Sequence, residues 1–240
     1  MNDVEGDITY IEPGYEVARP PISRTTPSEA VNWAWEQLQH RHLRLKEAVD
    51  VGCGRGRNSF FLARKGFHVT ALDFAPNAVE KLAEEAAKEG LGDKIRPVMQ
   101  DVAEPWPVAN EQMDLVVDAF CFKHLGTEAE RAEYKKNLLR ALGIKGHYLI
   151  SLGSIGDGYY GRYIHKKDEP DLPVSEAFKI DPYNGIESAV FTQQAVMQFF
   201  KPELEVEKEL LREIPADVAG KPPGHEVYAI LFRRYTPKWS

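Results

Sequence analysis

Three glycines alternate with other residues directly after a short apolar run. The run is Ala48-Val49-Asp50-Val51, and the segment after it reads Gly52-Cys53-Gly54-Arg55-Gly56. Because glycine has no Cβ, a ligand can lie against this backbone and against the N-terminus of a following helix. The spacing does not match the dinucleotide pattern G-x-G-x-x-G, since Arg57 or Ser59 would stand at its last position. The loop therefore predicts a ligand-binding turn without specifying the ligand.

A carboxylate ends the next apolar run, His68–Asp73. At the end of a strand beside the glycine loop, Asp73 could accept hydrogen bonds from both ribose hydroxyls of a nucleoside. It could instead cap a helix that begins near Pro76. The glycine loop and Asp73 together predict a nucleoside-containing ligand more specifically than either does alone.

The elements that must position these residues alternate between short apolar runs and helical spacing. Strands are expected at residues 48–51, 68–73, 95–100, 113–120 and 146–152. Helices are expected at 28–43, from about 60, at 76–90, at 127–142 with Gly143 ending the last, and from 192 to before Pro202. Two further strands, 204–214 and 227–234, follow with no helix between them.

This order predicts an α/β fold of the doubly wound, Rossmann-like type. Runs that are apolar throughout indicate strands buried on both faces, and the last two strands should form an antiparallel pair. The expected sheet has seven strands, mostly parallel with a C-terminal antiparallel strand pair. Such sheets bind ligands at the carboxyl ends of the strands, where the strand order reverses.

Two segments stand outside the alternation. Residues 1–28 contain four prolines and five acidic side chains, which predicts an N-terminal arm in front of a single domain at 29–240. Residues 153–190 or so are rich in Tyr, Gly, Pro and charge. So long an interruption within a compact domain predicts a functional insert, and we expect it to cover a substrate.

Composition narrows the class of protein. The 240 residues are 43% apolar, enough for a substantial core, and the net charge of −7 argues against a nucleic acid partner. Only Cys53 and Cys121 are present, so we expect no disulfide framework and no metal site, and a cytoplasmic location. No run approaches the length of a membrane span, and the acidic start does not resemble a signal peptide. The oligomeric state stays open.

Three segments together resemble the class I S-adenosylmethionine-dependent methyltransferases: Val49–Gly56, Asp73, and Gln100-Asp101-Val102. The resemblance covers roughly residues 45–235 and implies that S-adenosylmethionine is the cofactor. It places the cofactor-binding positions at Asp50, Gly52, Cys53, Gly54, Asp73, Phe74, Asp101, Val102 and Phe120. By this resemblance Asp73 holds the ribose, Phe74 lies along the adenine, and Asp101 takes the adenine amino group. Phe120 borders the methionine portion.

A small-molecule acceptor is implied by a weaker, narrower similarity. The stretch Gly52–Ser59 and the apolar final strand Tyr228–Phe232 are similar to the methyltransferases of tellurite and thiopurine detoxification. Methyl transfer is an in-line displacement that depends mainly on proximity and on the exclusion of water.

Residues that could serve the acceptor follow the fourth apolar run or lie in the insert. If the acceptor must lose a proton, His124 is the candidate base, because it stands just beyond Phe120. Three side chains of the insert could bind the acceptor: the rings of Tyr159 and Tyr160 and the guanidinium group of Arg162. Asp114 and Asp118 flank the same run and are expected to be solvated strand ends.

Several alternatives remain open at this stage. The sulfonium could serve cyclisation or aminopropyl transfer instead of methylation, and the acceptor could be a protein or tRNA, although no basic stripe supports that. A nicotinamide-dependent oxidoreductase is opposed by the glycine spacing. A non-catalytic nucleoside-binding module is opposed by the intact glycine loop with Asp73.

Overall fold

The computed structural model describes residues 26–40, 46–156, 164–165, 176–180, 187–214 and 225–235. Its helices are α1 (Glu29–Leu38), α2 (Arg57–Arg64), α3 (Pro76–Lys88), the 3-10 turn η1 (Phe122–His124), α4 (Glu128–Ala141) and α5 (Gln193–Phe200). Its first five strands are β1 (Glu47–Val51), β2 (His68–Asp73), β3 (Ile95–Met99), β4 (Met113–Ala119) and β5 (Leu142–Gly153). The others are β6 (Ile164–His165), β7 (Glu176–Ile180), β8 (Glu187–Phe191), β9 (Leu204–Ile214) and β10 (His225–Arg234).

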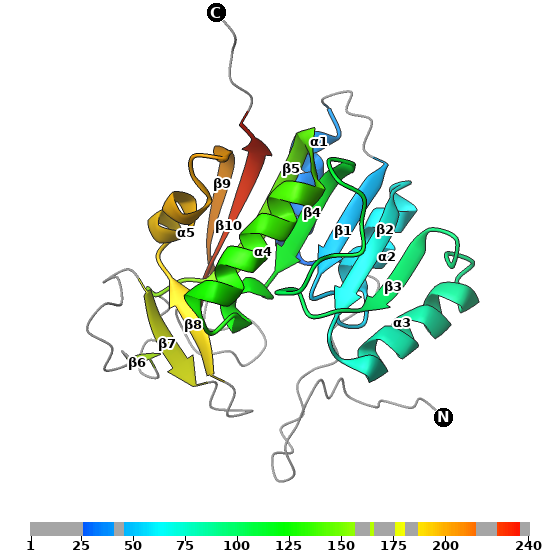
Figure 1. The fold of residues 1–240 in the computed structure, drawn as a ribbon, viewed down its shortest axis with the longest axis horizontal. Helices are drawn as coiled ribbons and strands as arrows, with labels where there is room; N and C mark the ends of the chain where they lie inside the picture. The colour runs from blue at the N-terminus through cyan, green and yellow to red at the C-terminus, as the bar shows by residue number, and fades with distance from the viewer. Residues whose placement is uncertain are drawn as a thin grey trace, which may run out of the picture.

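The large sheet has the strand order β3-β2-β1-β4-β5-β10-β9 (Figure 1). The strands from β3 to β5 pair in parallel. β10 runs antiparallel to both of its neighbours, β5 and β9. The predicted fold class is confirmed: a doubly wound, seven-stranded sheet that is mostly parallel and ends in an antiparallel strand pair.

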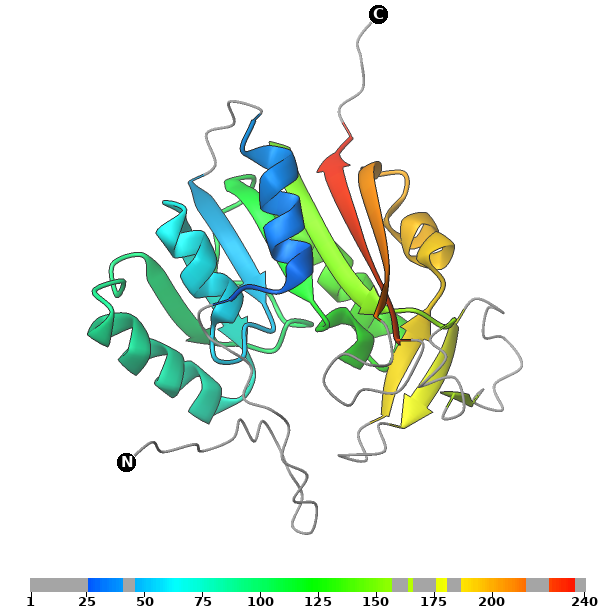
Figure 2. The ribbon, with the colours of Figure 1, turned by 180° about the vertical axis from the view of Figure 1, so that it is seen from behind.

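Helices cover both faces of this sheet, because its central strands are buried on both sides. In β5, Tyr148 and Ile150 belong to one buried cluster, together with residues of α4 and α5. Leu149 between them belongs to the opposite cluster, with residues of α1, α2 and α3. Figure 1 shows α4 in front of the sheet, and Figure 2 shows α1 and α2 in front of the other face. The side-chain period of two thus produces a three-layer domain.

Local sequence signals fix several element ends as predicted. Thr127 and Glu130 form a reciprocal capping box at the start of α4. Thr192 accepts the N–H of Ala195 as the N-cap of α5, and Pro76 stands at the first position of α3. Gly90 follows α3 with a positive φ of 69°, the conformation that ends a helix.

Two predicted boundaries are wrong. The first helix ends at Leu38 and not near residue 43. α4 ends at Ala141 and β5 begins at once, so Gly143 lies in a strand and does not cap the helix. A Cβ at Gly143 would lie 3.2 Å from the carbonyl oxygen of Glu111, which explains a glycine there by close backbone approach.

The insert contains strands that the sequence analysis did not predict. β6, β7 and β8 form a separate antiparallel sheet with β7 in the middle. β8 contacts the large domain, since Phe191 bridges to Ser154 just after β5. In both views the small sheet lies at the end of the large sheet where β1, β2 and β4 terminate. The predicted arm, apart from its last three residues, lies outside the described residues.

Candidate functional site

The candidate site lies at the carboxyl ends of β1, β2 and β4. β1 pairs with β2 on one side and with β4 on the other, so the strand order reverses at β1. Chains leaving neighbouring parallel strands in opposite directions open a crevice between them. The glycine loop after β1, the Asp73 segment after β2 and the turn after β4 therefore border one crevice.

The glycine loop is built on positive φ angles that only glycine adopts easily. Gly52 has φ of 64°, and a Cβ on it would lie 2.6 Å from Cβ of Cys121 in the turn after β4. Gly54 has φ of 53°, but a Cβ on it would meet no atom of the described residues within 4 Å. Gly52 thus lets the loop touch the β4 turn, whereas Gly54 has open space beside it. That open flank fits a ligand lying against the backbone.

Asp73 joins the glycine loop to the end of β2. Its Oδ2 accepts the N–H of Gly54 at 2.8 Å, and its Oδ1 accepts the N–H of Ala75 at 3.0 Å. The second bond shapes the entry into α3, so the capping role is present as well. The carboxylate is half-buried. Each carboxylate oxygen can accept a further hydrogen bond, so Asp73 has capacity left for a hydroxyl donor.

Asp50 lies buried beneath the glycine loop. Its Oδ2 accepts the hydroxyl of Ser59 on α2 at 2.5 Å, and its side chain is almost inaccessible to water. Burial raises the pKa of Asp50 to about 7, while the Ser59 hydrogen bond and the charge of Arg57 act in the opposite direction. The loop therefore rests on a carboxyl group whose charge changes near neutral pH.

The ends of β2 and β3 carry the residues expected around an adenine ring. Phe74 is 69% exposed, which is unusual for so large an apolar side chain. Asp101 is exposed, and its Oδ1 accepts the N–H of Ala103 at 2.9 Å. Val102 is buried, and its carbonyl oxygen accepts the indole N–H of Trp106 at 2.9 Å.

The turn after β4 closes the other side of the crevice. Phe120 has φ of 75°, a left-handed conformation that is rare for an aromatic residue. His124, the candidate base, ends η1 and is exposed. Asp118 was expected to be a solvated strand end, and that prediction is wrong. It is fully buried and accepts hydrogen bonds from Cys121, Phe122 and Tyr134.

Known proteins match this chain over the same elements. The family model described as "Methyltransferase domain" matches residues 48–146, from β1 into β5. The probable S-adenosyl-L-methionine-dependent methyltransferase TehB of Haemophilus influenzae is 32% identical over 106 residues, 43% of this chain and 35% of TehB. The 2-heptyl-1-hydroxyquinolin-4(1H)-one methyltransferase of Mycobacteroides abscessus is 27% identical over 135 residues, 55% of this chain and 56% of that protein.

A solved structure extends the likeness to the whole sheet. The crystal structure of an S-adenosylmethionine-dependent methyltransferase from Methanosarcina mazei superimposes with a TM-score of 0.66 at 20% identity, covering 83% of this chain and 98% of that one. Residues 48–146 thus match a methyltransferase domain, and the fold of the described residues is that of a class I S-adenosylmethionine-dependent methyltransferase. The curated relatives named above are matched over only about a third to a half of their length.

The methyltransferase domain brings most of the sequence-predicted cofactor residues to one edge of the sheet. The glycine loop, Asp73 and the β4 turn are joined by the contacts given above, and Phe74, Asp101 and Val102 follow the two adjacent strands. Tyr159, Tyr160 and Arg162 lie outside the described residues. The sequence analysis missed Asp118, and the apolar neighbours of that residue in β4 were the available signal.

Both cysteines of the methyltransferase domain are free thiols. Cys53 is buried in the glycine loop, and burial raises the pKa of its thiol well above the usual range. Burial does the same for Cys121, with further contributions from the carboxylates of Asp118 and Asp73. Within the described part of the chain, no three His, Cys, Asp or Glu side chains are grouped to hold a metal ion.

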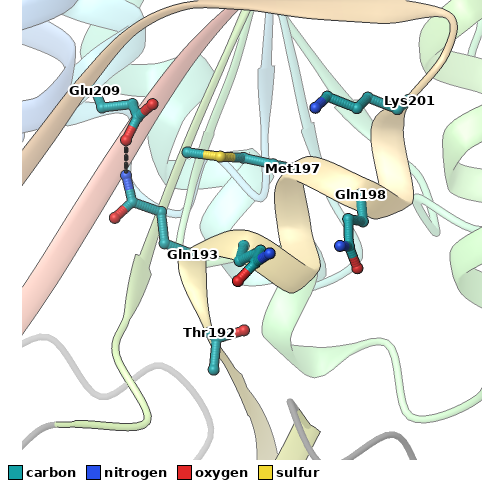
Figure 3. Close-up of a pocket in the computed structure, with 7 residues that line it drawn as sticks. Thr192, Gln193, Met197, Gln198, Lys201 and Glu209 are labelled. Carbon is teal, nitrogen blue, oxygen red and sulfur yellow. Dashed lines mark hydrogen bonds between the residues drawn. The ribbon is translucent and has the colours of Figure 1, made fainter.

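A separate surface groove lies away from the crevice. It is a groove between α5 and β9, and Figure 3 shows Gln193 donating to Glu209 across it at 2.8 Å. Its lining residues are Thr192, Gln193, Gln194, Met197, Gln198, Lys201 and Glu209. β9 is separated from β1 by β4, β5 and β10, so this groove is not part of the candidate site. None of the helices in the described ranges combines the length and apolarity needed to cross a membrane.

Proposed function

We propose that the protein transfers the methyl group of S-adenosylmethionine to a small-molecule acceptor by in-line displacement. The observation that carries the proposal is the open flank of Gly54, held beside Asp73 by a 2.8 Å hydrogen bond at the crevice between β1 and β4. A nucleoside ligand needs both features: backbone that it can approach closely, and a carboxylate for its ribose hydroxyls. For the acceptor only the class is supported, because the relatives include a methyltransferase named for a small-molecule substrate.

The residues proposed to hold the cofactor fall into two groups. Asp73 binds the ribose while it keeps the N–H of Gly54, and Gly52, Cys53 and Gly54 present their backbone to the methionine portion. Asp50 supports that loop from below. On the adenine side the proposed residues are Phe74, Asp101 and Val102, and Phe120 borders the methionine portion. The exposure of Phe74 supports its part, because a flat ring laid on it would remove apolar surface from water.

The chemistry needs little from the protein besides alignment. When bound, S-adenosylmethionine supplies an electrophilic methyl group on a sulfonium cation. The chain's own residues bind, orient and exclude water, which is how a displacement of this type is accelerated. The raised thiol pKa values of Cys53 and Cys121 keep both residues protonated at neutral pH, so neither competes as a nucleophile.

On the acceptor side, His124 is proposed as the group that removes a proton where the acceptor carries one. It stands at the end of η1 and is exposed at the same edge of the sheet as the glycine loop. Tyr159, Tyr160 and Arg162 are proposed to bind the acceptor from the insert at about 153–190. In this proposal residues 1–28 form an arm, residues 29–240 are one domain, and the protein acts in the cytoplasm.

Calorimetry with S-adenosylmethionine, S-adenosylhomocysteine and NAD tests the cofactor assignment. We expect binding of the first two and none of NAD, because the loop lacks the dinucleotide spacing. Binding of NAD without binding of the sulfonium compound would refute the proposal. A metabolite screen that couples methylated product to S-adenosylhomocysteine release then tests the acceptor class. Formation of a cyclised or aminopropylated product would show that the sulfonium serves another reaction.

A further inference from the structure

The turn that follows β4 rests on a buried carboxylate to which the proposed function assigns no role. Asp118 precedes the last residue of β4 and is inaccessible to water. Its Oδ1 accepts the N–H of Cys121 at 2.8 Å, and its Oδ2 accepts the N–H of Phe122 at 3.0 Å. These two amides lead the chain from the sheet into η1. The carboxylate therefore fixes the path of the chain where it enters the candidate site.

Phe120 lies between Asp118 and Cys121 in the chain, and its backbone is held in an unfavourable conformation. Phe120 has φ of 75°, and its own N–H donates to the carbonyl oxygen of Ser151 on β5 at 3.0 Å. An aromatic residue keeps such a conformation only where its surroundings enforce it. Ser151 holds the N–H of Phe120, and Asp118 holds the next amide, that of Cys121. Lys123 then places its ammonium group 5.7 Å from the centre of the Phe120 ring.

On its other side the carboxylate accepts a hydrogen bond from one tyrosine hydroxyl. The hydroxyl of Tyr134 on α4 donates to Oδ2 at 2.8 Å and lies 3.1 Å from the hydroxyl of Tyr148 on β5. Among the described residues the partners of Asp118 are thus two amides and one phenol. Burial raises the pKa of Asp118 to about 6, and Tyr134 and the two amides act against that rise.

Among the described residues, none of the other groups that face Asp118 changes charge near neutral pH. The titratable groups around it are the Cys121 thiol in the turn, the Tyr134 phenol on α4 and the Tyr148 phenol on β5. Burial raises the pKa of each well above its usual value, so each stays neutral. The charge that holds the turn is therefore that of Asp118 alone.

The same tyrosine connects the turn to the adenine side of the crevice. The Tyr134 ring packs edge-on against Trp106, with centroids 5.4 Å apart, and the Trp106 indole donates to the carbonyl of Val102. The Phe122 ring packs against Tyr134 at 5.3 Å. One buried block of rings around Asp118 thus contacts both the segment after β3 and the turn after β4.

We propose that Asp118 is a positioning residue for methyl transfer: it sets the turn that carries Phe120, and through Tyr134 it ties that turn to the adenine side of the cofactor site. The proposal rests on the proposed function, since it assumes that this crevice binds S-adenosylmethionine. A residue that only stabilised the core would change thermal stability without changing the surroundings of the bound methyl group.

The test uses S-adenosylmethionine labelled with ¹³C in its methyl group, bound to the full chain and observed by NMR. Asp118→Asn keeps the size and one acceptor oxygen but removes the charge. Tyr134→Phe removes only the hydroxyl that donates to the carboxylate. The matched control is Tyr228→Phe, which removes a buried hydroxyl of the same core cluster, bonded to the carbonyl of Phe191 at 3.3 Å.

We expect both test variants to bind S-adenosylmethionine within about threefold of wild type, because neither residue is among those proposed to contact it. The bound methyl resonance should move in both, and the amides of Cys121 and Phe122 should exchange about tenfold faster. The control should keep the wild-type resonance and exchange. In wild type these two amide resonances should titrate together with a midpoint of about 6, a step that Asp118→Asn abolishes.

An unmoved methyl resonance in Asp118→Asn and Tyr134→Phe would overturn the proposal and leave Asp118 a stabilising core residue. If Asp118→Asn does not fold, Tyr134→Phe decides alone by the same criterion. A wild-type protein that gives no bound methyl resonance would refute the proposed function instead, so the two failures are distinguishable.

Discussion

Replacing Gly54 with alanine tests whether the open flank of the glycine loop is the cofactor-binding surface. Because no atom of the described residues lies within 4 Å of the added Cβ, folding loses only the cost of holding an L-residue at φ of 53°, about 1–2 kcal/mol. For a domain of this size that lowers Tm by roughly 2–8 °C. The added methyl group occupies the space proposed for the cofactor, so affinity for S-adenosylhomocysteine should fall at least about tenfold, or 1.4 kcal/mol.

The matched control is Gly66→Ala, in the turn between α2 and β2 at the opposite edge of the sheet. Gly66 also has a positive φ, 96°, and also has no atom within 4 Å of its built Cβ. It should lose a comparable amount of stability and keep wild-type affinity. Differential scanning fluorimetry measures Tm, and isothermal titration calorimetry with S-adenosylhomocysteine measures binding. Equal affinities for the Gly54 and Gly66 variants would refute the placement of the cofactor at Gly54.

Three further outcomes are expected. Asp73→Ala should weaken S-adenosylhomocysteine binding about tenfold or more by calorimetry, since the ribose and Gly54 lose their acceptor; unchanged affinity would leave Asp73 a capping residue only. Asp50→Asn should gain stability relative to wild type in urea unfolding as pH rises from about 4 to 7, because folded Asp50 keeps a proton that the unfolded chain releases; a constant difference would contradict its pKa of about 7. Thr127→Ala should lower stability by about 1 kcal/mol through loss of the capping box, and an unchanged Tm would exclude that contribution.

The strands of the large sheet could be predicted because their signal is local and repeated. Each run that is apolar on both faces, such as Leu115 to Val117, indicates a strand with helices on either side. Capping residues, such as Thr127 and Thr192, mark helix starts within one residue. The glycine loop is also local, so its position and the residue that meets it, Asp73, followed from the sequence.

The apolar neighbours of Asp118 in β4 indicate burial, but the partner that bonds its carboxylate, Tyr134 on α4, could not be predicted. Asp114 and Asp118 flank the same apolar run, and their residue type is identical. Asp114 stays half-exposed and caps the amides of Lys46 and Glu47. Asp118 is buried, and the hydroxyl of Tyr134 on α4 bonds its carboxylate there together with two backbone amides. The sequence contains both residues but not the contact between them.

The small sheet was missed for a different reason. β6 has two residues, and β7 and β8 have five each, so none gives a long periodic signal. Charged residues, three prolines and a glycine stand between them, which favours a loop assignment. Antiparallel pairing of these short strands is a tertiary event, and only the apolar end of β8, from Ala189 to Phe191, indicated it.

The place of β10 in the sheet has a consequence for folding during synthesis. β10 is the last strand in the chain, but it lies between β5 and β9, with Val227 opposite Gly153. Until residues 225–234 leave the ribosome, β5 presents an open strand edge and β9 has no partner in the large sheet. The nascent chain therefore passes through a stage with two unpaired strands. At that stage it is most prone to aggregate and has the greatest need of a chaperone. Truncation before residue 225 would hold the chain at that stage permanently.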